Sequence, residues 1–379
     1  MAKVERIEPT QLPNGLWLDG NEYASENVEE SSGVLSLETG ETEGYRVSPE
    51  LDVGAISDVG ISKLEWTSSG DVEVSSILTQ LDELPSITDA DGADDGITFS
   101  SAPNLPGDQT VMVWANMQAF ESNSEHGDWL ISLRSQLEGN RSFQIVYSGG
   151  GNAFRIGFWL SDDTSIGLDF STSQPSLNTW YHLCYTFKSG EILRVYQDGT
   201  LSESSATALG PRNAATNMSF FRVTGWAANY NYLRANAKMA HVKMWNRVLT
   251  QSEIQHEMYH DPDLTDTNLA HWWPLGKYGA ADQVGSLNGT VTGAAVRDAE
   301  TPLWRPATNL AAIPSVSVND DLTGKYLHLR QDLSRDTTGD PSPTLTELKA
   351  TVEEASGALP LINGGLIRSA HTQNNTMIR

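Results

Sequence analysis

A long series of short segments rich in β-branched and aromatic residues constrains the fold more than any other feature of this chain. Between residues 110 and 199 these segments read TVMVWANM, SFQIVYS, AFRIGFWL, SIGLDFS, TWYHLCYTF and ILRVYQDG, with Gly, Asn, Asp or Ser between them. Segments of this length and composition predict β-strands, and their number predicts an antiparallel sandwich. One helix is also predicted, with Thr250 or Ser252 as its N-cap and Pro262 as its stop.

Composition narrows the class of protein. The 379 residues are 39% hydrophobic, which is enough for the packed cores of two domains. The formal net charge of −25 gives a surface that repels phosphate backbones, so we predict no nucleic-acid partner. An acidic, lysine-poor surface suits high-salt solvent and favours a halophilic or marine origin, but many ordinary extracellular proteins are also acidic.

Two further features bear on location. No stretch approaches 18 apolar residues, and the start MAKVERIEPTQLPNG lacks the apolar core of a signal peptide. We therefore predict neither membrane insertion nor a secretion route. Cys184 is the only cysteine, so an intrachain disulfide is excluded, and its place in WYHLCYTF indicates a buried strand thiol.

Residues 97–300 resemble the laminin G-like, concanavalin A-like lectin/glucanase jelly roll. Four segments stand in that family's order: DADGADDGITFSSAPNLPGDQTVMVWANM, NTWYHLCYTFKSGEILRVYQDGTL, AKMAHVKMWNRVLTQSEI and LAHWWPLGKYGAADQVGSLNGTVTGAAV. The residues agree with the resemblance, because alternate positions of TWYHLCYTF suit a core and Asp198-Gly199 predicts a hairpin turn.

The flanks predict a second, smaller β-sandwich. Residues 16–96 supply three or four strands and residues 301–355 about three more; neither half closes a sandwich alone. We therefore predict a jelly roll inserted into a discontinuous sandwich, with splice points between Gln80 and Ile97 and near Glu300 to Leu303. These flanks resemble a sandwich found in structural proteins of tailed viruses.

The two ends of the chain complete the predicted organisation. Residues 1–15 form an N-terminal arm. Residues 356–379 contain Gly, Asn and Pro but no strand or helix period, which is typical of a tail without structure of its own. We predict that this tail docks on neighbouring chains.

The loop VTGWAANYNYLRAN is the predicted carbohydrate contact. Flat aromatic faces cover the apolar face of a sugar, while amides bond its hydroxyls. The same side chains are also suited to packing over the sandwich edge. The predicted glycan-binding residues are Trp226, Asn229, Tyr230, Asn231 and Tyr232.

Calcium is the one predicted cofactor, because the resemblance implies an ion at the rim of the sandwich. Calcium takes six to eight oxygen ligands from carboxylate-rich loops. The loop DADGADDG and the segment D-x-x-G-x-x-N-G-T supply such groups, and the alternative is a solvated acidic turn. The predicted ligands are Asp91, Asp94, Asp95 and Asp282.

HEMYH is the sharpest catalytic motif. His256 and His260 flank Glu257 with the H-E-x-x-H spacing of zinc proteases. However, Pro262 follows at once and no third histidine continues the pattern, so we interpret the match as a coincidence. The E-x-D-x-E triplet by which jelly-roll glucanases place their carboxylates is absent. We therefore predict a protein without catalytic residues.

Three functional hypotheses follow. The first is a virion structural protein whose partners are other virion proteins and copies of itself, and whose jelly roll binds a host glycan or glycoprotein at the particle surface. The second is a carbohydrate-binding adhesive module of a cell-surface protein, which should carry an export signal. The third is a zinc hydrolase that uses HEMYH.

Overall fold

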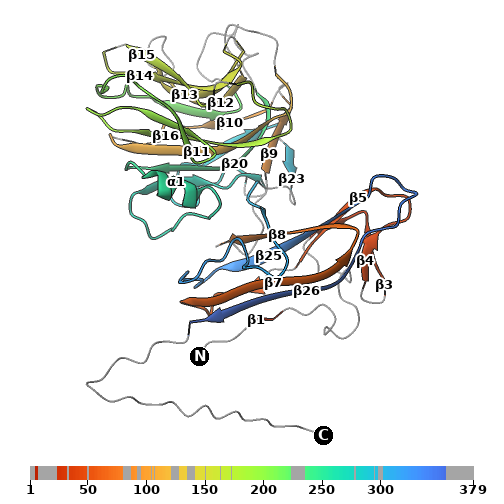
Figure 1. Ribbon diagram of the computed structural model, residues 1–379. Coiled ribbons are helices and arrows are strands. Elements are labelled where there is room, and N and C mark those ends of the chain that lie inside the picture. Colours follow the sequence, from red (N-terminus) through yellow and green to blue (C-terminus); the bar gives the residue numbers. More distant parts are fainter. Residues whose placement is uncertain are drawn as a thin grey trace, which may run out of the picture.

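The computed structural model describes residues 5–6, 24–31, 34–48, 51–79, 87–91, 95–103, 105, 107–120, 128–134, 141–149, 151–162, 164–171, 173–222, 235–276, 279–293, 295–297 and 302–355. These residues form antiparallel sheets and one short helix, α1 (Gln251–Glu257), which confirms the all-β fold class (Figure 1).

Two antiparallel sheets build the jelly roll, the upper body in Figure 1. The seven-stranded sheet has the order β15 (Ser165–Asp169), β14 (Ala153–Trp159), β13 (Arg141–Ser148), β12 (Asp128–Arg134), β19 (Asn217–Phe220), β10 (Gly96–Phe99), β22 (Gly289–Thr292). The main path of the eight-stranded sheet is β18 (Thr200–Ser204), β17 (Arg194–Gln197), β16 (Trp180–Phe187), β11 (Gln109–Met117), β20 (Asn236–Trp245), β9 (Ile87–Asp91), β23 (Ala295–Arg297). The remaining strand, β21 (Leu269–Trp273), pairs with β20.

Aromatic side chains fill the core between these sheets. Phe220 and Trp273 are fully buried and meet edge to face at 5.6 Å between ring centroids. The adjacent Trp272 points to the opposite face and lies against His241. The predicted turn at Asp198-Gly199 joins β17 to β18, with φ of 49° and 70°. Both φ values lie in the left-handed region that a two-residue hairpin turn requires.

A second pair of sheets, here called the outer sandwich, combines strands from both flanks of the chain. One sheet contains β1 (Glu5–Arg6), β26 (Thr344–Glu354), β4 (Val34–Leu37), β3 (Val28–Ser31) and β7 (Val59–Ser69). The other contains β2 (Ala24–Glu26), β5 (Glu43–Val47), β25 (Tyr326–Ser334), β8 (Asp71–Thr79), β24 (Arg305–Pro306) and β6 (Leu51–Asp52). Its longest ladders join the flanks, β7 to β26 and β8 to β25. Leu64, Leu329 and Leu345 lie in the core between the sheets.

Strand pairing places the beginning of the jelly roll earlier than the predicted boundary at residue 97. Strand β9 pairs with β20 and β23, both in a jelly-roll sheet. Strand β9 therefore belongs to a jelly-roll sheet, and the predicted splice points stay a prediction.

A small apolar interface joins the two bodies. Val47, Ile77 and Leu303 pack with Trp114 and Met258 from the jelly roll. The indole N–H of Trp114 donates to the carbonyl of Met258 at 2.8 Å. Because Val47 and Ile77 belong to β5 and β8, the sheet of β7 and β26 lies on the side away from the jelly roll (Figure 1).

We expect residues 81–301 to fold alone, and the remainder to stay folded when a short Gly/Ser loop replaces them. Each body has its own core, so each should unfold in a cooperative transition. Thermal unfolding followed by calorimetry measures this. A fragment that starts at residue 97 is the matched comparison, and it should be less stable because it lacks β9. If fragment 81–301 shows no cooperative transition, the insertion model is wrong.

Candidate functional site

The described residues that border two predicted ligand-binding loops lie together at one end of the jelly roll. Asp91, the last residue of β9, pairs with Asn236, the first residue of β20. The residue after which the predicted acidic loop begins is therefore the strand partner of the residue before which the predicted aromatic loop ends. The ends of the aromatic loop also meet, since the N–H of Ala235 donates to the carbonyl of Phe221 at 2.9 Å. We call this end of the sandwich the rim.

At the rim, the structure describes the strand residues that border the two predicted loops. Asp91 lies at the end of β9, and Asp95 is described and buried, at 5% exposure. The calcium site therefore stays a prediction, as does the glycan contact. The residues outside the described part of the chain are Asp94, Trp226, Asn229, Tyr230, Asn231 and Tyr232.

Asp282 lies at the centre of a hydrogen-bond network. Its Oδ1 accepts from the backbone amides of Trp272, Val284 and Gly285 at 3.1–3.2 Å. Its Oδ2 accepts from His271 Nδ1 at 2.7 Å and from the amide of Leu287 at 3.2 Å. Five N–H donors thus face one carboxylate, which does not favour a role as a calcium ligand.

The pKa of Asp282 reflects this network. Burial alone raises the pKa of a carboxyl group, but hydrogen bonds from His271 and from the amides of Gly285 and Trp272 outweigh burial and hold the pKa below its usual value. The charged form of Asp282 therefore connects β21 to the 282–287 turn through its hydrogen bonds.

The HEMYH segment is engaged in internal contacts. The helix begins at Thr250, as predicted, with a capping box between Thr250 and Glu253. It ends at Glu257, before the predicted stop, so His260 lies outside it. The rings of His256 and His260 stack at 4.0 Å, and His260 Nδ1 is 2.6 Å from the His256 carbonyl oxygen.

Lys243 contacts the end of the helix. Its side chain is only 2% exposed, and its ammonium group donates to the Glu257 carboxylate at 3.2 Å. It also donates to the carbonyl of Glu257 at 2.6 Å and to the carbonyl of His260. These contacts use all three donors of the lysine and satisfy carbonyl groups at and beyond the end of the helix.

Two histidines near Lys243 are held neutral. Burial, and then the charge of Lys243, lower the pKa of His182 to about 3. Burial, and then the neighbouring His256, lower the pKa of His260 to about 3. A positive charge on either ring is thus disfavoured beside the ammonium group.

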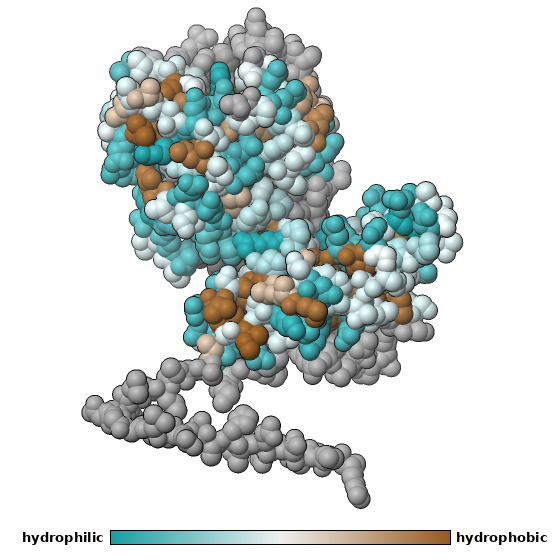
Figure 2. Space-filling model, in the orientation of Figure 1, coloured by the Kyte–Doolittle hydropathy of each residue, from teal (hydrophilic) through white to brown (hydrophobic). Residues whose placement is uncertain are grey.

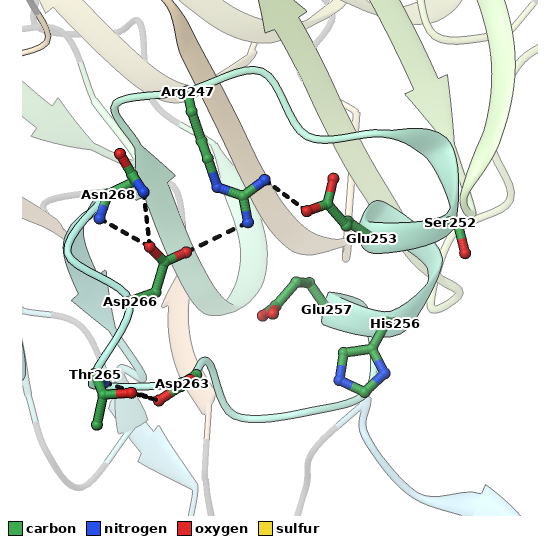
Figure 3. A pocket seen from close by; sticks show the side chains of 9 residues that line it. All are labelled: Arg247, Ser252, Glu253, His256, Glu257, Asp263, Thr265, Asp266 and Asn268. Atoms are coloured by element: carbon green, nitrogen blue, oxygen red, sulfur yellow. Dashed lines mark hydrogen bonds and ion pairs between the residues drawn. The ribbon is translucent and has the colours of Figure 1, made fainter.

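A polar cavity of about 740 Å³ opens between α1 and the segment that follows it (Figure 3). Arg247 lies between Glu253 and Asp266, to which it is paired at 2.6 and 3.3 Å. Glu257 points into the space between the helix and the chain around Asp263. The cavity therefore presents acceptors for the hydroxyl or amino groups of a polar ligand. No local sequence pattern indicates this cavity, because the pairing partners of Arg247 follow it by six and 19 residues on separate segments.

Two negative findings concern the described residues alone. Within the ranges given above, no group of three or more His, Cys, Asp or Glu side chains is placed to hold a metal ion. In the same part of the chain, no helix has the length and apolar character needed to cross a bilayer.

The comparison with protein families supports the jelly roll. Residues 91–255 match the family described as the concanavalin A-like lectin/glucanases superfamily. The match spans less than half of the 379 residues and runs from the last residue of β9 into α1. No curated protein sequence matches the chain.

Several solved structures are similar at low identity. A putative carbohydrate binding protein from Bacteroides ovatus is 13% identical with a TM-score of 0.42, over 72% of this chain and 94% of that one. A heptameric SAP-like pentraxin from Limulus polyphemus is 13% identical with a TM-score of 0.33, over 65% and 98%. The binding domain of botulinum neurotoxin serotype D is 14% identical with a TM-score of 0.35, over 53% and 52%.

Proposed function

We propose that this chain is a non-enzymatic structural protein of a tailed-virus particle, which displays its jelly roll to bind glycans on the host surface. The outer sandwich is the part built into the particle. The observation that carries the proposal is the path of β9, which leads from the outer sandwich to the rim (Figure 1). Asn236, which follows the predicted aromatic loop, therefore lies opposite Asp91, at the end of β9 farther along the chain from the outer sandwich.

Three observations support the parts of this proposal. Residues 91–255 match a superfamily that contains lectins, which favours a carbohydrate ligand. The flanking sequence resembles sandwiches of tailed-virus structural proteins, which favours a virion. Glu257, the required base of the zinc-hydrolase hypothesis, is paired with Lys243, and the glucanase triplet is absent, which favours a protein without catalysis.

Locating the chain in purified particles tests the proposal directly. We expect mass spectrometry to find it in particles, and antibody labelling to place the jelly roll on their surface. Purified protein should also compete with particles for adsorption to host cells. A chain absent from particles but attached to cell envelopes would instead support the adhesive module of a cell-surface protein.

We expect Trp226→Ala and Tyr230→Ala each to weaken glycan or cell binding by about 1–3 kcal/mol, or roughly five- to more than hundredfold. Aromatic anchors carry much of the energy of such contacts, and the sandwich beneath holds their loop in place. Adsorption isotherms with labelled protein measure the loss. Leu201→Ala is the control, because Leu201 is 45% exposed on β18, outside this loop. Unchanged adsorption with a large fall in melting temperature would show that the aromatic residues pack rather than bind.

A further inference from the structure

An apolar patch lies on the outer sandwich beside the start of β7. Its members are Ile61, Leu310 and Val318, which are 50%, 65% and 61% exposed. The chain from Leu310 to Val318 follows β7, since the N–H of Leu310 donates to the carbonyl of Leu64, and the residue after Val318 donates to Val59. Figure 2 shows apolar surface on this body. Exposed large apolar side chains along one edge of a sandwich offer a surface for an interaction.

The chain leaves the outer sandwich at the border of this patch. The N–H of Ala355 donates to the carbonyl of Asp58 at 2.7 Å, directly before β7. The fit is tight, because a Cβ on Gly60 would lie 2.6 Å from the Cα of Ala355. Since β26 runs antiparallel to β7, the chain at Ala355 heads away from its own patch.

Residues 356–379, here called the tail, have the composition that the patch requires. Arg368 and Arg379 are the only Lys, Arg, Asp or Glu residues of the tail, so the first 355 residues carry −25 − 2 = −27. Five of its six Leu and Ile residues lie in the first half and are Leu359, Leu361, Ile362, Leu366 and Ile367; the sixth is Ile378.

Acidic residues border the patch. Glu353 is the strand partner of Ile61, and Glu354 follows it. Asp320 follows Val318 by two positions, and its carbonyl accepts from the N–H of Val59. The patch thus offers an apolar centre with carboxylates beside it, which complements an aliphatic segment that carries arginine.

We propose that the tail of one copy docks on the apolar patch of a second copy of this chain. The aliphatic residues of the tail cover Ile61, Leu310 and Val318, and Arg368 lies near the carboxylates. A contact between two different surfaces of identical chains is heterologous, so it links copies into a ring or a chain unless two copies exchange tails reciprocally. This assembly contact is independent of glycan binding.

Sedimentation velocity of the full chain across a hundredfold range of concentration tests the proposal. We expect the mass to rise with concentration, and a chain that ends at Ala355 to stay monomeric throughout. A synthetic peptide of residues 356–379 should return the full chain to a monomer. Equal masses for the full and shortened chains would overturn the proposal. A second result would also overturn the proposal: the full chain is monomeric at every concentration, and the shortened chain binds more hydrophobic dye than the full chain. The tail would then cover the patch of its own copy.

Point variants assign the contact to its two surfaces. Leu361→Asp in the tail and Val318→Asp in the patch should each abolish the rise in mass. Leu201→Asp is the matched control, because it places the same charge at an exposed leucine of the jelly roll, and the rise should persist. If Leu201→Asp abolishes association as well, the effect is general repulsion and the assigned contact is wrong. Host-cell adsorption of the monomeric variants stays intact, which separates this inference from the glycan proposal.

Discussion

Replacement of Lys243 by methionine is expected to lower the free energy of unfolding of the jelly roll by about 3–5 kcal/mol. The substitution keeps most of the buried aliphatic volume but leaves the Glu257 carboxylate without its cation. It also removes the donor from two carbonyl groups at the end of α1. Leaving one carboxylate and two carbonyl groups without their buried partner lowers the free energy of unfolding far more than losing a surface ion pair does. Urea unfolding followed by tryptophan fluorescence measures the change.

Two further variants test the cause of this loss. Lys188→Met removes a lysine whose ion pair with Glu191 is about half exposed, and it should cost less than about 1 kcal/mol. The double variant Lys243→Met with Glu257→Gln should recover part of the stability, because the unpaired charge is gone. If the Lys243→Met protein is as stable as the Lys188→Met protein, the buried contacts of Lys243 do not stabilise the jelly roll more than a surface ion pair does.

Asp282→Ala is expected to destabilise the jelly roll by a similar amount, about 3–5 kcal/mol. The side chain is fully buried and accepts five hydrogen bonds, so its removal leaves several N–H donors without a partner. Asp162→Ala is the control, since Asp162 is exposed and its carboxylate accepts from the backbone N–H and the hydroxyl of Thr164. Thermal unfolding of both variants at neutral pH measures the difference.

The pH dependence gives this prediction a second readout. The folded-state pKa of Asp282 is lowered, so its contribution is present above the unfolded pKa of about 3.9 and disappears as pH falls through the folded value. The gap in stability between wild type and Asp282→Ala should therefore be constant near neutral pH and shrink below about pH 4. A gap that does not change in acid would mean that the carboxylate charge does not carry the effect.

The local features of this fold were predictable from the sequence. The alternate core positions Leu183, Tyr185 and Phe187 of TWYHLCYTF, the turn at Asp198-Gly199 and the N-cap at Thr250 all appear as predicted. Each depends on residues within a few positions of one another, where side-chain periodicity and turn chemistry act directly. Cys184 is buried as predicted, but on the opposite face of β16, where it packs in a separate cluster with Leu249 and Ile254.

Contacts between distant segments were decided by the tertiary structure alone. Nothing near Lys243 in the sequence indicates that it pairs with Glu257, and nothing near Asp91 indicates that it lies opposite Asn236. HEMYH shows most clearly how a local pattern and a distant contact differ. Its spacing fits a zinc-binding helix, but the helix ends at Glu257, where Lys243 of strand β20 pairs with the carboxylate. The partner of a buried charge depends on the register of strands that are far apart in the chain, and the sequence within one segment does not encode that register.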